Sequence, residues 1–267
     1  MHTAVTEQQI EHYRQQGFLV LANFLDPAEL EHWRQVTGAA VRQRLAGAAL
    51  NNQANPETFY AQVFTQCLNL RDIYAPMAEL LYDPRLAAVA GALAGVDAVR
   101  VWQDQALIKP PYGNHTGFHF DDPYWSFYSR QAVSVWVALD DATIENGCLW
   151  YLPGTHLESR FELVPIGENL GDIFKHYPQW KTLAAVPAPC PAGSLVFHNP
   201  MIAHGAGVNM TPRPRRAMTL AYMPDGMTFN GQQSLLSSEY VQTLKLGDLL
   251  NNDQINRLVW RREEQVA

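Results

Sequence analysis

The feature that most restricts the fold of this chain is a change of pattern near residue 97. Before it, the pattern is mainly helical. After it, short runs rich in valine, leucine and aromatic residues follow one another, bounded by Gly, Pro, Asn and Asp. Helices followed by many short strands are typical of an α+β fold whose strands form a barrel or sandwich. The expected strands cover residues 99–109, 132–139, 148–152, 194–198 and 217–223.

The first 96 residues are expected to be mainly helical. Thr6 and Gln9 form the capping box of a first helix, which Gly17 ends. Asp26 before Pro27 marks the start of a second helix, because proline at the first helical position loses no hydrogen bond. A short strand is expected over residues 18–21 and another helix over residues 83–95.

The length of 267 residues fits one large domain, which we expect to span residues 1–267. Residues 97–225 are expected to form the β core, and residues 226–267 a C-terminal extension in which helical periodicity returns from residue 237. A long segment of mixed pattern, residues 159–186, interrupts the core between two strands. Because such insertions often act as lids, a lid is a hypothesis for this segment.

The charge balance and the apolar pattern exclude several classes of partner. With 26 Asp and Glu against 19 Lys and Arg, the net charge is −7, which argues against a general surface for a phosphate backbone. The longest apolar run, residues 86–96, is shorter than the roughly 20 residues that cross a bilayer, and the N-terminal residues lack the apolar stretch of a signal peptide. The 3 cysteines form no C-x-x-C pair. The sequence therefore indicates a cytoplasmic protein that binds neither nucleic acid nor membrane.

The segment around His119-Phe-Asp121 contains the first candidate metal ligands. Residues two apart on a strand face the same side, so His119 and Asp121 can bind one metal while Asp122 points away. An imidazole and a carboxylate from one strand, with a second distant imidazole, form the facial triad of non-heme Fe(II) oxygenases. The composition alone predicts roughly one such pair by chance, and His156 with Glu158 is a second. The surrounding sequence must therefore decide.

The distant imidazole is supplied about 80 residues further on, where a strand leads into the Gly-rich turn that begins at His204. Arg215 follows eleven residues later, at the start of the next expected strand. Three protein ligands on one face of an iron leave positions for a chelating 2-oxo acid and for dioxygen. The far carboxylate of a 2-oxo diacid fits a guanidinium, whose planar fork binds it through two hydrogen bonds.

With these motifs in place, the sequence resembles the phytanoyl-CoA dioxygenase family of Fe(II)/2-oxoglutarate oxygenases over about residues 6–223. The segments that carry the resemblance are Gly17-Phe-Leu-Val-Leu, Lys109-Pro-Pro, His119-Phe-Asp121, Trp136-Val-Ala-Leu-Asp-Asp, Glu145-Asn-Gly-Cys-Leu-Trp-Tyr-Leu-Pro-Gly-Thr-His156, Gly193-Ser-Leu-Val-Phe, His204-Gly-Ala-Gly-Val-Asn209 and Arg215-Arg-Ala. Each is weak alone, but together they follow the order of the family.

The resemblance implies a double-stranded β-helix, a cupin-like jelly roll, with N-terminal and C-terminal helices packed on it. It further implies that the ligands of the Fe(II) are His119, Asp121 and His204. Arg215 would pair with the far carboxylate of 2-oxoglutarate, and Trp136 and Gln105 match positions at which the family contacts this co-substrate, although the family commonly has another side chain at the Gln105 position.

Several neighbouring residues are alternatives. His198 lies near the distal ligand, but its strand position and the register of the family favour His204. Arg213 is an alternative carboxylate anchor to Arg215, which the eleven-residue offset favours, and strand alternation places Arg216 on the other face. Structural or rim positions, not catalytic ones, are expected for Lys109, His115 and His156.

The substrate contacts are the least defined part of the site. Tyr124, Trp125, Phe127 and Tyr128 follow the first ligand strand and form either an aromatic wall or core packing. Arg130 either meets an anionic group of the substrate or is a solvated surface charge. The sequence offers no basic cluster outside the iron site for the phosphates of coenzyme A, so a small metabolite or natural-product intermediate is favoured over an acyl-CoA.

The expected function is hydroxylation, or a related oxidation, of an unactivated C–H bond of such a molecule, with Fe(II), 2-oxoglutarate and dioxygen and with release of succinate and CO2. The resemblance further implies that an intact carboxylate at Asp121 favours hydroxylation over halogenation, because some members of the wider superfamily have Gly or Ala at this position, which opens a site for halide. Two alternatives stay open: a metal-dependent hydrolase or isomerase on a cupin-like barrel, which has no need of Arg215, and a non-enzymatic protein that binds metal or ligand.

Overall fold

The computed structural model describes residues 5–47, 50–54 and 59–263, so residues 1–4 and 264–267 of the expected terminal segments lie outside the description. The α-helices are α1 (Glu7–Gln16), α2 (Pro27–Leu45), α3 (Phe59–Val63), α4 (Ala75–Leu81), α5 (Pro84–Ala94) and α6 (Ser238–Val241). The strands are β1 (Phe18–Leu21), β2 (Thr65–Leu68), β3 (Ala98–Lys109), β4 (Thr116–His119), β5 (Val133–Ala138), β6 (Leu149–Tyr151), β7 (Val186–Ala188), β8 (Leu195–His198), β9 (His204–Ala206), β10 (Arg215–Pro224) and β11 (Leu258–Arg261).

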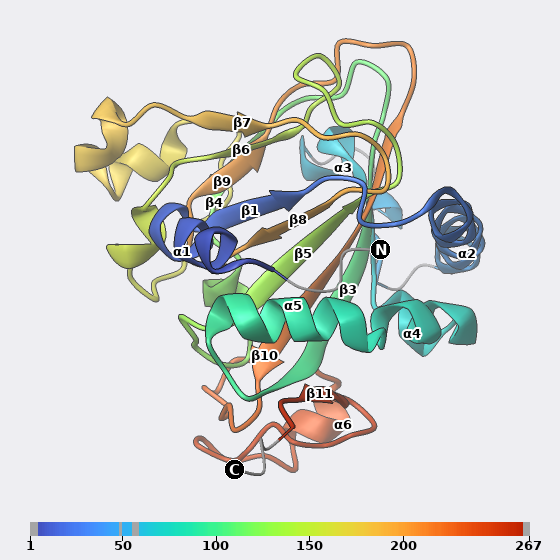
Figure 1. Ribbon diagram of the computed structural model, residues 1–267, viewed down its shortest axis with the longest axis vertical. Helices are drawn as coiled ribbons and strands as arrows, with labels where there is room; N and C mark the ends of the chain where they lie inside the picture. Colours follow the sequence, from blue (N-terminus) through green and yellow to red (C-terminus); the bar gives the residue numbers. More distant parts are fainter. Residues whose placement is uncertain (1–4, 48–49, 55–58, 264–267) are drawn as a thin grey trace.

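The strands form two antiparallel sheets. The larger sheet has the order β1-β8-β5-β10-β3-β11, with β2 also paired to β3, and the smaller sheet has the order β4-β9-β6-β7. Figure 1 shows the long strands of the larger sheet crossing the molecule, with α5, α4 and α2 alongside them. Neighbours in each sheet are mostly distant in sequence. Residues of both sheets line one cavity. The predicted α+β fold with a β core is confirmed.

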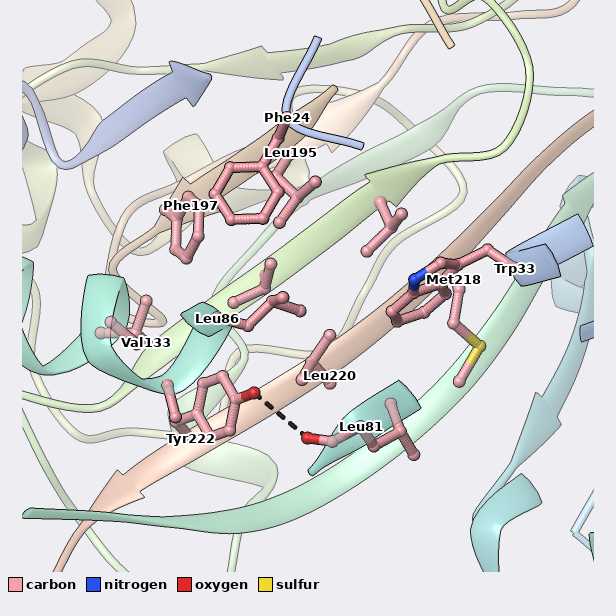
Figure 2. Close-up of a cluster of buried hydrophobic side chains, with 14 of the residues drawn as sticks. Phe24, Trp33, Leu81, Leu86, Val133, Leu195, Phe197, Met218, Leu220 and Tyr222 are labelled. Carbon is pink, nitrogen blue, oxygen red and sulfur yellow. Dashed lines mark hydrogen bonds between the residues drawn. The ribbon is translucent and has the colours of Figure 1, made fainter. Parts of the chain in front are cut away.

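One face of the larger sheet is covered by the N-terminal helices. Alternate residues of β5, β8 and β10 are apolar and buried on this face, where they meet side chains of α2, α4 and α5 (Figure 2). Burial of each large apolar side chain stabilises the fold by about 1.5–3 kcal/mol. The hydroxyl of Tyr222 donates to the carbonyl oxygen of Leu81 at 3.2 Å, so the polar end of this buried side chain is satisfied. Members of the cluster are Trp33, Leu81, Leu86, Val133, Leu195, Phe197, Met218, Leu220 and Tyr222.

The alternate residues of the same strands point the other way, toward the cavity. They include Ser134 and Trp136 of β5, His198 of β8 and Thr219 of β10. Because successive side chains of a strand lie on opposite faces, the apolar pattern that attaches the helices also decides which residues reach the cavity.

The predicted helix boundaries of the N-terminal part are confirmed. The side chain of Thr6 accepts from the backbone N–H of Gln9, and Asp26 caps α2 in the same way. At the ends of α1 and α5, Gly17 and Gly95 have φ values of 85° and 70°, which glycine adopts without a steric penalty.

The predicted helical periodicity of the C-terminal extension is wrong for most of its described length. Only α6, of 4 residues, is α-helical there, and β11 instead pairs with β3, with Leu258 opposite Arg100 and Arg261 opposite Ala98. The edge of β3 is free for pairing at this end because β2 covers only its other end, over Gln105 to Ile108. The gain from edge pairing therefore outweighs the weak local preference for helix.

The insertion of residues 159–186 is packed on the smaller sheet. It contains the 3-10 helices η5 (Asp172–Lys175) and η6 (Pro178–Thr182). Tyr177 and Trp180 meet Phe120 edge to face, with ring centroids 5.5 and 5.9 Å apart. Ile166 of this segment lines the cavity, so the insertion supplies part of the cavity wall. Within the described ranges, no helix combines the length and the apolar character that crossing a membrane requires.

Substitution of Gly91 tests the docking of the C-terminal strand. A Cβ at Gly91 on α5 would overlap the ring of Trp260 from β11. We expect Gly91→Ala to lower the free energy of unfolding by about 1–3 kcal/mol, because overpacking outweighs the better helix propensity of alanine. The control is Gly38→Ala on α2, whose nearest atom lies at 3.5 Å and which should stabilise by about 0.5–1 kcal/mol. Chemical denaturation measures both, and equal stability of the two variants would contradict this packing.

Candidate active site

The two expected histidine ligands lie opposite each other on neighbouring strands of the smaller sheet. His119 is the last residue of β4, His204 is the first residue of β9, and the two are partners in the strand register. Oδ1 of Asp121 lies 3.7 Å from Nε2 of His119 and 3.6 Å from Nε2 of His204. Among the described residues, these three side chains form the group whose ligand atoms all lie within 4.8 Å of one another.

The position of Asp121 differs from the expectation. β4 ends at His119, and Asp121 follows it with helical φ and ψ of −85° and −47°. Strand alternation is therefore not what brings the two side chains together. The backbone N–H of Asp121 donates to the carbonyl oxygen of Pro200 at 2.8 Å, which fixes the turn after the strand. Asp122 does point away, because its Oδ2 accepts from the backbone N–H of Ser129.

The protonation of both ligand imidazoles is set by backbone carbonyls. Nδ1 of His119 lies 2.9 Å from the oxygen of Gly117, and Nδ1 of His204 lies 3.0 Å from that of Ile202. A carbonyl oxygen only accepts, so Nδ1 carries the proton and the Nε2 lone pair is free. Burial lowers the pKa of each imidazole to about 4, so both are neutral at neutral pH. Both histidines are therefore ready to bind a metal through Nε2.

The second carboxylate oxygen of Asp121 is held by residues that the metal-site prediction did not include. Oδ2 accepts from the Ser134 hydroxyl at 2.7 Å and lies 3.2 Å from Nε2 of His198. An ionised carboxylate only accepts, so Nε2 of His198 carries the proton, and the hydroxyl of Tyr151 donates to Nδ1 of His198 at 3.0 Å. Burial opposes ionisation of Asp121, but its interactions with His204 and the His198 hydrogen bond hold the pKa of this carboxyl below its ordinary value. His198 thus orients Asp121.

Removal of the His198 donor should weaken metal binding. We expect His198→Phe to lower the affinity for Fe(II) by about 10–100-fold, because Asp121 loses one of two donors that fix it. His198→Gln keeps an N–H donor and should retain more of the affinity. Equilibrium dialysis without dioxygen measures both, with the exposed His32→Phe as control. Equal affinities of the His198 variants and wild type would contradict the role of this hydrogen bond.

Arg215 is a buried guanidinium without a full set of partners. It begins β10 and is 3% exposed, and its Nε and Nη1 have no hydrogen-bond partner among the described residues. Its Cζ lies 5.0 Å from the ring centroid of Trp136. Burial lowers its pKa to about 10, so it stays charged at neutral pH. A buried unpaired charge is costly, so the arrangement fits an anionic group of a bound molecule.

The two alternative arginines do not reach this position. Arg213 is exposed in the turn before β10. Arg216 faces the other side of the strand, where its Nη2 and Nε pair with the carboxylate of Asp140 at 2.6 and 2.9 Å. The predicted alternation of Arg215 and Arg216 is therefore confirmed.

A cavity of about 460 Å³ joins the metal-binding group to Arg215. Trp136 and Gln105 both line it, and Oε1 of Gln105 accepts from Nε2 of Gln66 at 2.5 Å. Sequence reasoning missed Ser134, Gln66 and Gln103, which also line the cavity. Ser134 stands two residues before Trp136 and Gln103 two before Gln105, so strand alternation was a signal that could have found both.

The predicted substrate contacts divide into two groups. Tyr124 and Trp125 line the cavity, and the hydroxyl of Tyr124 donates to the carbonyl oxygen of Val164 in the insertion. The structure does not bring Phe127, Tyr128 or Arg130 to the cavity wall. Phe127 is fully buried in a separate apolar cluster, and Tyr128, 45% exposed, packs against Phe161. The guanidinium of Arg130 donates to the carbonyl oxygens of His156 and Ser159, both at 2.6 Å, so it fixes a loop instead of meeting a substrate.

The remaining candidates have structural contacts, as expected. His156 bonds through Nε2 to the carbonyl oxygen of Arg14 at 3.0 Å, and Glu158 accepts from Trp180. These two side chains have separate partners and form no metal pair. Lys109 is fully buried and donates to the carbonyl oxygen of Asn114, while His115 contacts that of Glu168.

Comparison with known proteins gives a consistent set of matches. The family described as "Phytanoyl-CoA dioxygenase (PhyH)" matches residues 13–217. The methylphosphonate hydroxylase of Gimesia maris is 27% identical over 227 residues, covering 83% of this chain and 82% of that protein. The ectoine dioxygenase of Bordetella parapertussis is 28% identical over 254 residues, covering 85% and 78%. The structure of SnoK, a non-heme alpha-ketoglutarate-dependent carbocyclase from nogalamycin biosynthesis, has a TM-score of 0.78 at 23% identity, covering 95% of this chain and 96% of that one. This likeness confirms the double-stranded β-helix.

Proposed function

Because the chain belongs to the phytanoyl-CoA dioxygenase family, we propose that it oxidises a C–H bond of a small organic metabolite or natural-product intermediate, releasing succinate and CO2. It is a non-heme Fe(II)/2-oxoglutarate-dependent oxygenase that acts on small molecules. Hydroxylation is the outcome that the intact Asp121 carboxylate favours over halogenation. The observation that carries the proposal is one cavity with a two-imidazole, one-carboxylate group and the unpaired guanidinium of Arg215.

The residues fit both implied groups. Two neutral imidazoles and one carboxylate are the donor set that Fe(II) takes in this class of site, and they would hold the ion through Nε2 of His119, Nε2 of His204 and Oδ1 of Asp121. Arg215 has buried N–H groups to offer to the far carboxylate of 2-oxoglutarate. When bound, iron and 2-oxoglutarate supply the activation of dioxygen.

The side chains around these groups orient them and exclude water. The hydrogen bonds from Ser134 and His198 to Oδ2 leave Oδ1 of Asp121 directed at the two histidines. Trp136 covers the guanidinium of Arg215, and Gln105 extends the same wall, so both would flank the co-substrate. Tyr124 and Trp125 would contact the substrate. Their apolar surfaces keep the reacting part of the cavity dry, which strengthens every charge interaction in it.

The test supplies the purified protein with Fe(II), 2-oxoglutarate, dioxygen and a panel of small metabolites. Succinate release that needs both Fe(II) and 2-oxoglutarate is expected, and a substrate in the panel should gain the mass of one oxygen atom. Mass spectrometry reads the product and succinate together. Absence of succinate under all conditions, or turnover that does not need 2-oxoglutarate, would refute the proposal and favour a hydrolase, an isomerase or a binding protein.

A further inference from the structure

The cavity extends well beyond the part that 2-oxoglutarate can occupy. In the register of β10 and β3, Arg215 lies opposite Lys109. Gln103 precedes Lys109 by six residues on β3 and lies opposite Ala221. At about 3.3 Å per residue, these two positions are roughly 20 Å apart along the sheet. A five-carbon diacid anchored at Arg215 is too short to reach Gln103. The end of the cavity at Gln103, which we call the distal end, is therefore left for the substrate.

The distal end has no charge to offer to a substrate. Among the described lining residues, Asp121 and Arg215 are the two with an acidic or guanidinium side chain, and both belong to the iron and co-substrate sites. Lys109, the nearest further cation along β3, is fully buried and donates to the carbonyl oxygen of Asn114 instead of entering the cavity. Asp121 lies at the level of Gln103 through its bond to Ser134, and the metal would balance its charge. Apart from Asp121, an ionised group placed at the distal end would meet no opposite charge in its wall.

Neutral hydrogen-bonding groups line the distal end instead. The side-chain amide of Gln103 makes no hydrogen bond to other side chains or backbone in the described ranges. Gln66 lies nearer to Arg215, opposite Leu107, where its amide nitrogen bonds to Gln105 and its side-chain oxygen bonds to no other side chain or backbone of the described ranges. Ser234 adds a hydroxyl from the C-terminal extension. Apolar surface beside these groups comes from Leu68, Trp125, Ile166 and Leu235.

From this lining we infer that the substrate is an uncharged molecule that carries amide, carbonyl or hydroxyl groups on an apolar skeleton. Unpaired amides bind such groups by donating and accepting hydrogen bonds, whereas an ion in the same place loses its hydration without gaining a counter-charge. The inference deepens the proposed function and rests on it, because only an oxygenase places 2-oxoglutarate at Arg215. It also predicts that an anionic phosphonate is not the substrate of this chain.

The test compares three probes with one skeleton: phenylacetamide, phenylacetate and phenethylamine, which are neutral, anionic and cationic at neutral pH. Binding is measured by calorimetry or NMR on protein loaded with Fe(II) and 2-oxoglutarate without dioxygen, so that Arg215 is already occupied. We expect the amide to bind at least about tenfold more tightly than either ion. Equal or tighter binding of either ion, or no binding of the amide, overturns the inference.

A charge placed at the distal end should reverse the preference. Gln103→Glu is expected to make phenethylamine the tightest of the three probes, because the carboxylate supplies the missing counter-charge. The matched control is Gln179→Glu, an exposed glutamine of η6 outside the cavity, which should leave the wild-type order unchanged. An unchanged order in a folded Gln103→Glu variant overturns the inference. If that variant does not fold, the comparison of probes on the wild type decides alone.

Failure of this inference is distinguishable from failure of the proposed function. Succinate release from 2-oxoglutarate on the same preparation tests the oxygenase reaction and does not depend on probe charge. Succinate release together with tighter binding of an ion overturns the substrate class and leaves the oxygenase standing. Lack of succinate together with amide preference overturns the oxygenase and still supports a neutral ligand at Gln103.

Discussion

Arg215→Ala is expected to raise the KM for 2-oxoglutarate by about 100-fold or more, because the far carboxylate loses a buried guanidinium that could bind it through two charged hydrogen bonds. The effect on kcat at saturating 2-oxoglutarate should be smaller, since the guanidinium binds the end of the co-substrate that does not react. Succinate release at increasing 2-oxoglutarate concentrations measures both constants. An unchanged KM would mean that another group binds the far carboxylate, and Arg215 would have to be abandoned as its anchor.

Two further variants show whether the far carboxylate needs Arg215 itself or only a positive charge nearby. Arg213→Ala removes a cation two residues earlier in the exposed turn and should leave the KM for 2-oxoglutarate unchanged. Arg215→Lys keeps the charge but loses the planar fork, so an intermediate KM is expected. If Arg213→Ala raised the KM as much as Arg215→Ala does, the rejected alternative anchor would have to be reinstated.

Stability measurements test whether Arg215→Ala raises the KM only because the variant is less stably folded. Nε and Nη1 of Arg215 are unpaired among the described residues, so the protein without co-substrate contains an uncompensated buried charge. Removal of this charge should not lower the melting temperature of the unloaded protein. 2-Oxoglutarate should raise the melting temperature of the wild type more than that of Arg215→Ala, because a ligand stabilises in proportion to its affinity.

The fold was predictable wherever local pattern and tertiary packing agree. Capping residues marked the starts of α1 and α2, and short apolar runs marked most strands, because the buried face of each element requires them. The C-terminal extension was not predictable in this way. Residues 258–261 are a strand because the edge of β3 is free to pair with them, and one segment's periodicity contains no information about a distant edge.

The same limit applies to the site. His119, Asp121 and His204 were identified by residue type and order, although Asp121 reaches the group from a turn and not from the expected strand. The contacts of His198 and Tyr151 were not predictable, because they depend on how β6 and β8 approach each other across the barrel. Residue type alone also does not show which of several neighbouring side chains reaches the cavity.

Aromatic and basic side chains near the first ligand illustrate this. Tyr124, Trp125, Tyr128 and Arg130 follow one another closely, and they looked equivalent in the sequence. The short 3-10 helix η3 (Asp122–Tyr124) turns the chain after the ligand, so the first two reach the cavity and the last two contact Phe161 and loop carbonyls. Short irregular turns of this kind have no periodic signature from which the direction of a side chain could be read.

The largest expected effect is that of Asp121→Asn on metal binding. The substitution keeps the size of the side chain and its contacts with Ser134 but removes the negative charge and one of the three ligands. We expect the affinity for Fe(II) to fall by about 100-fold or more, because the two neutral imidazoles that remain do not balance the charge of the ion. Succinate release should fall with it at limiting Fe(II).

Asp122→Asn is the matched control for this prediction, because it changes the adjacent carboxyl to the same amide. Burial raises the pKa of Asp122 to about 8, so this side chain is already mostly uncharged at neutral pH, and an asparagine oxygen can still accept from the backbone N–H of Ser129. Equilibrium dialysis of Fe(II) without dioxygen should therefore separate the two variants, with wild-type affinity for Asp122→Asn. Similar losses in both would mean that the affinity depends on the conformation of this turn and not on one carboxylate, and the assignment of Oδ1 of Asp121 as a direct ligand would have to be abandoned.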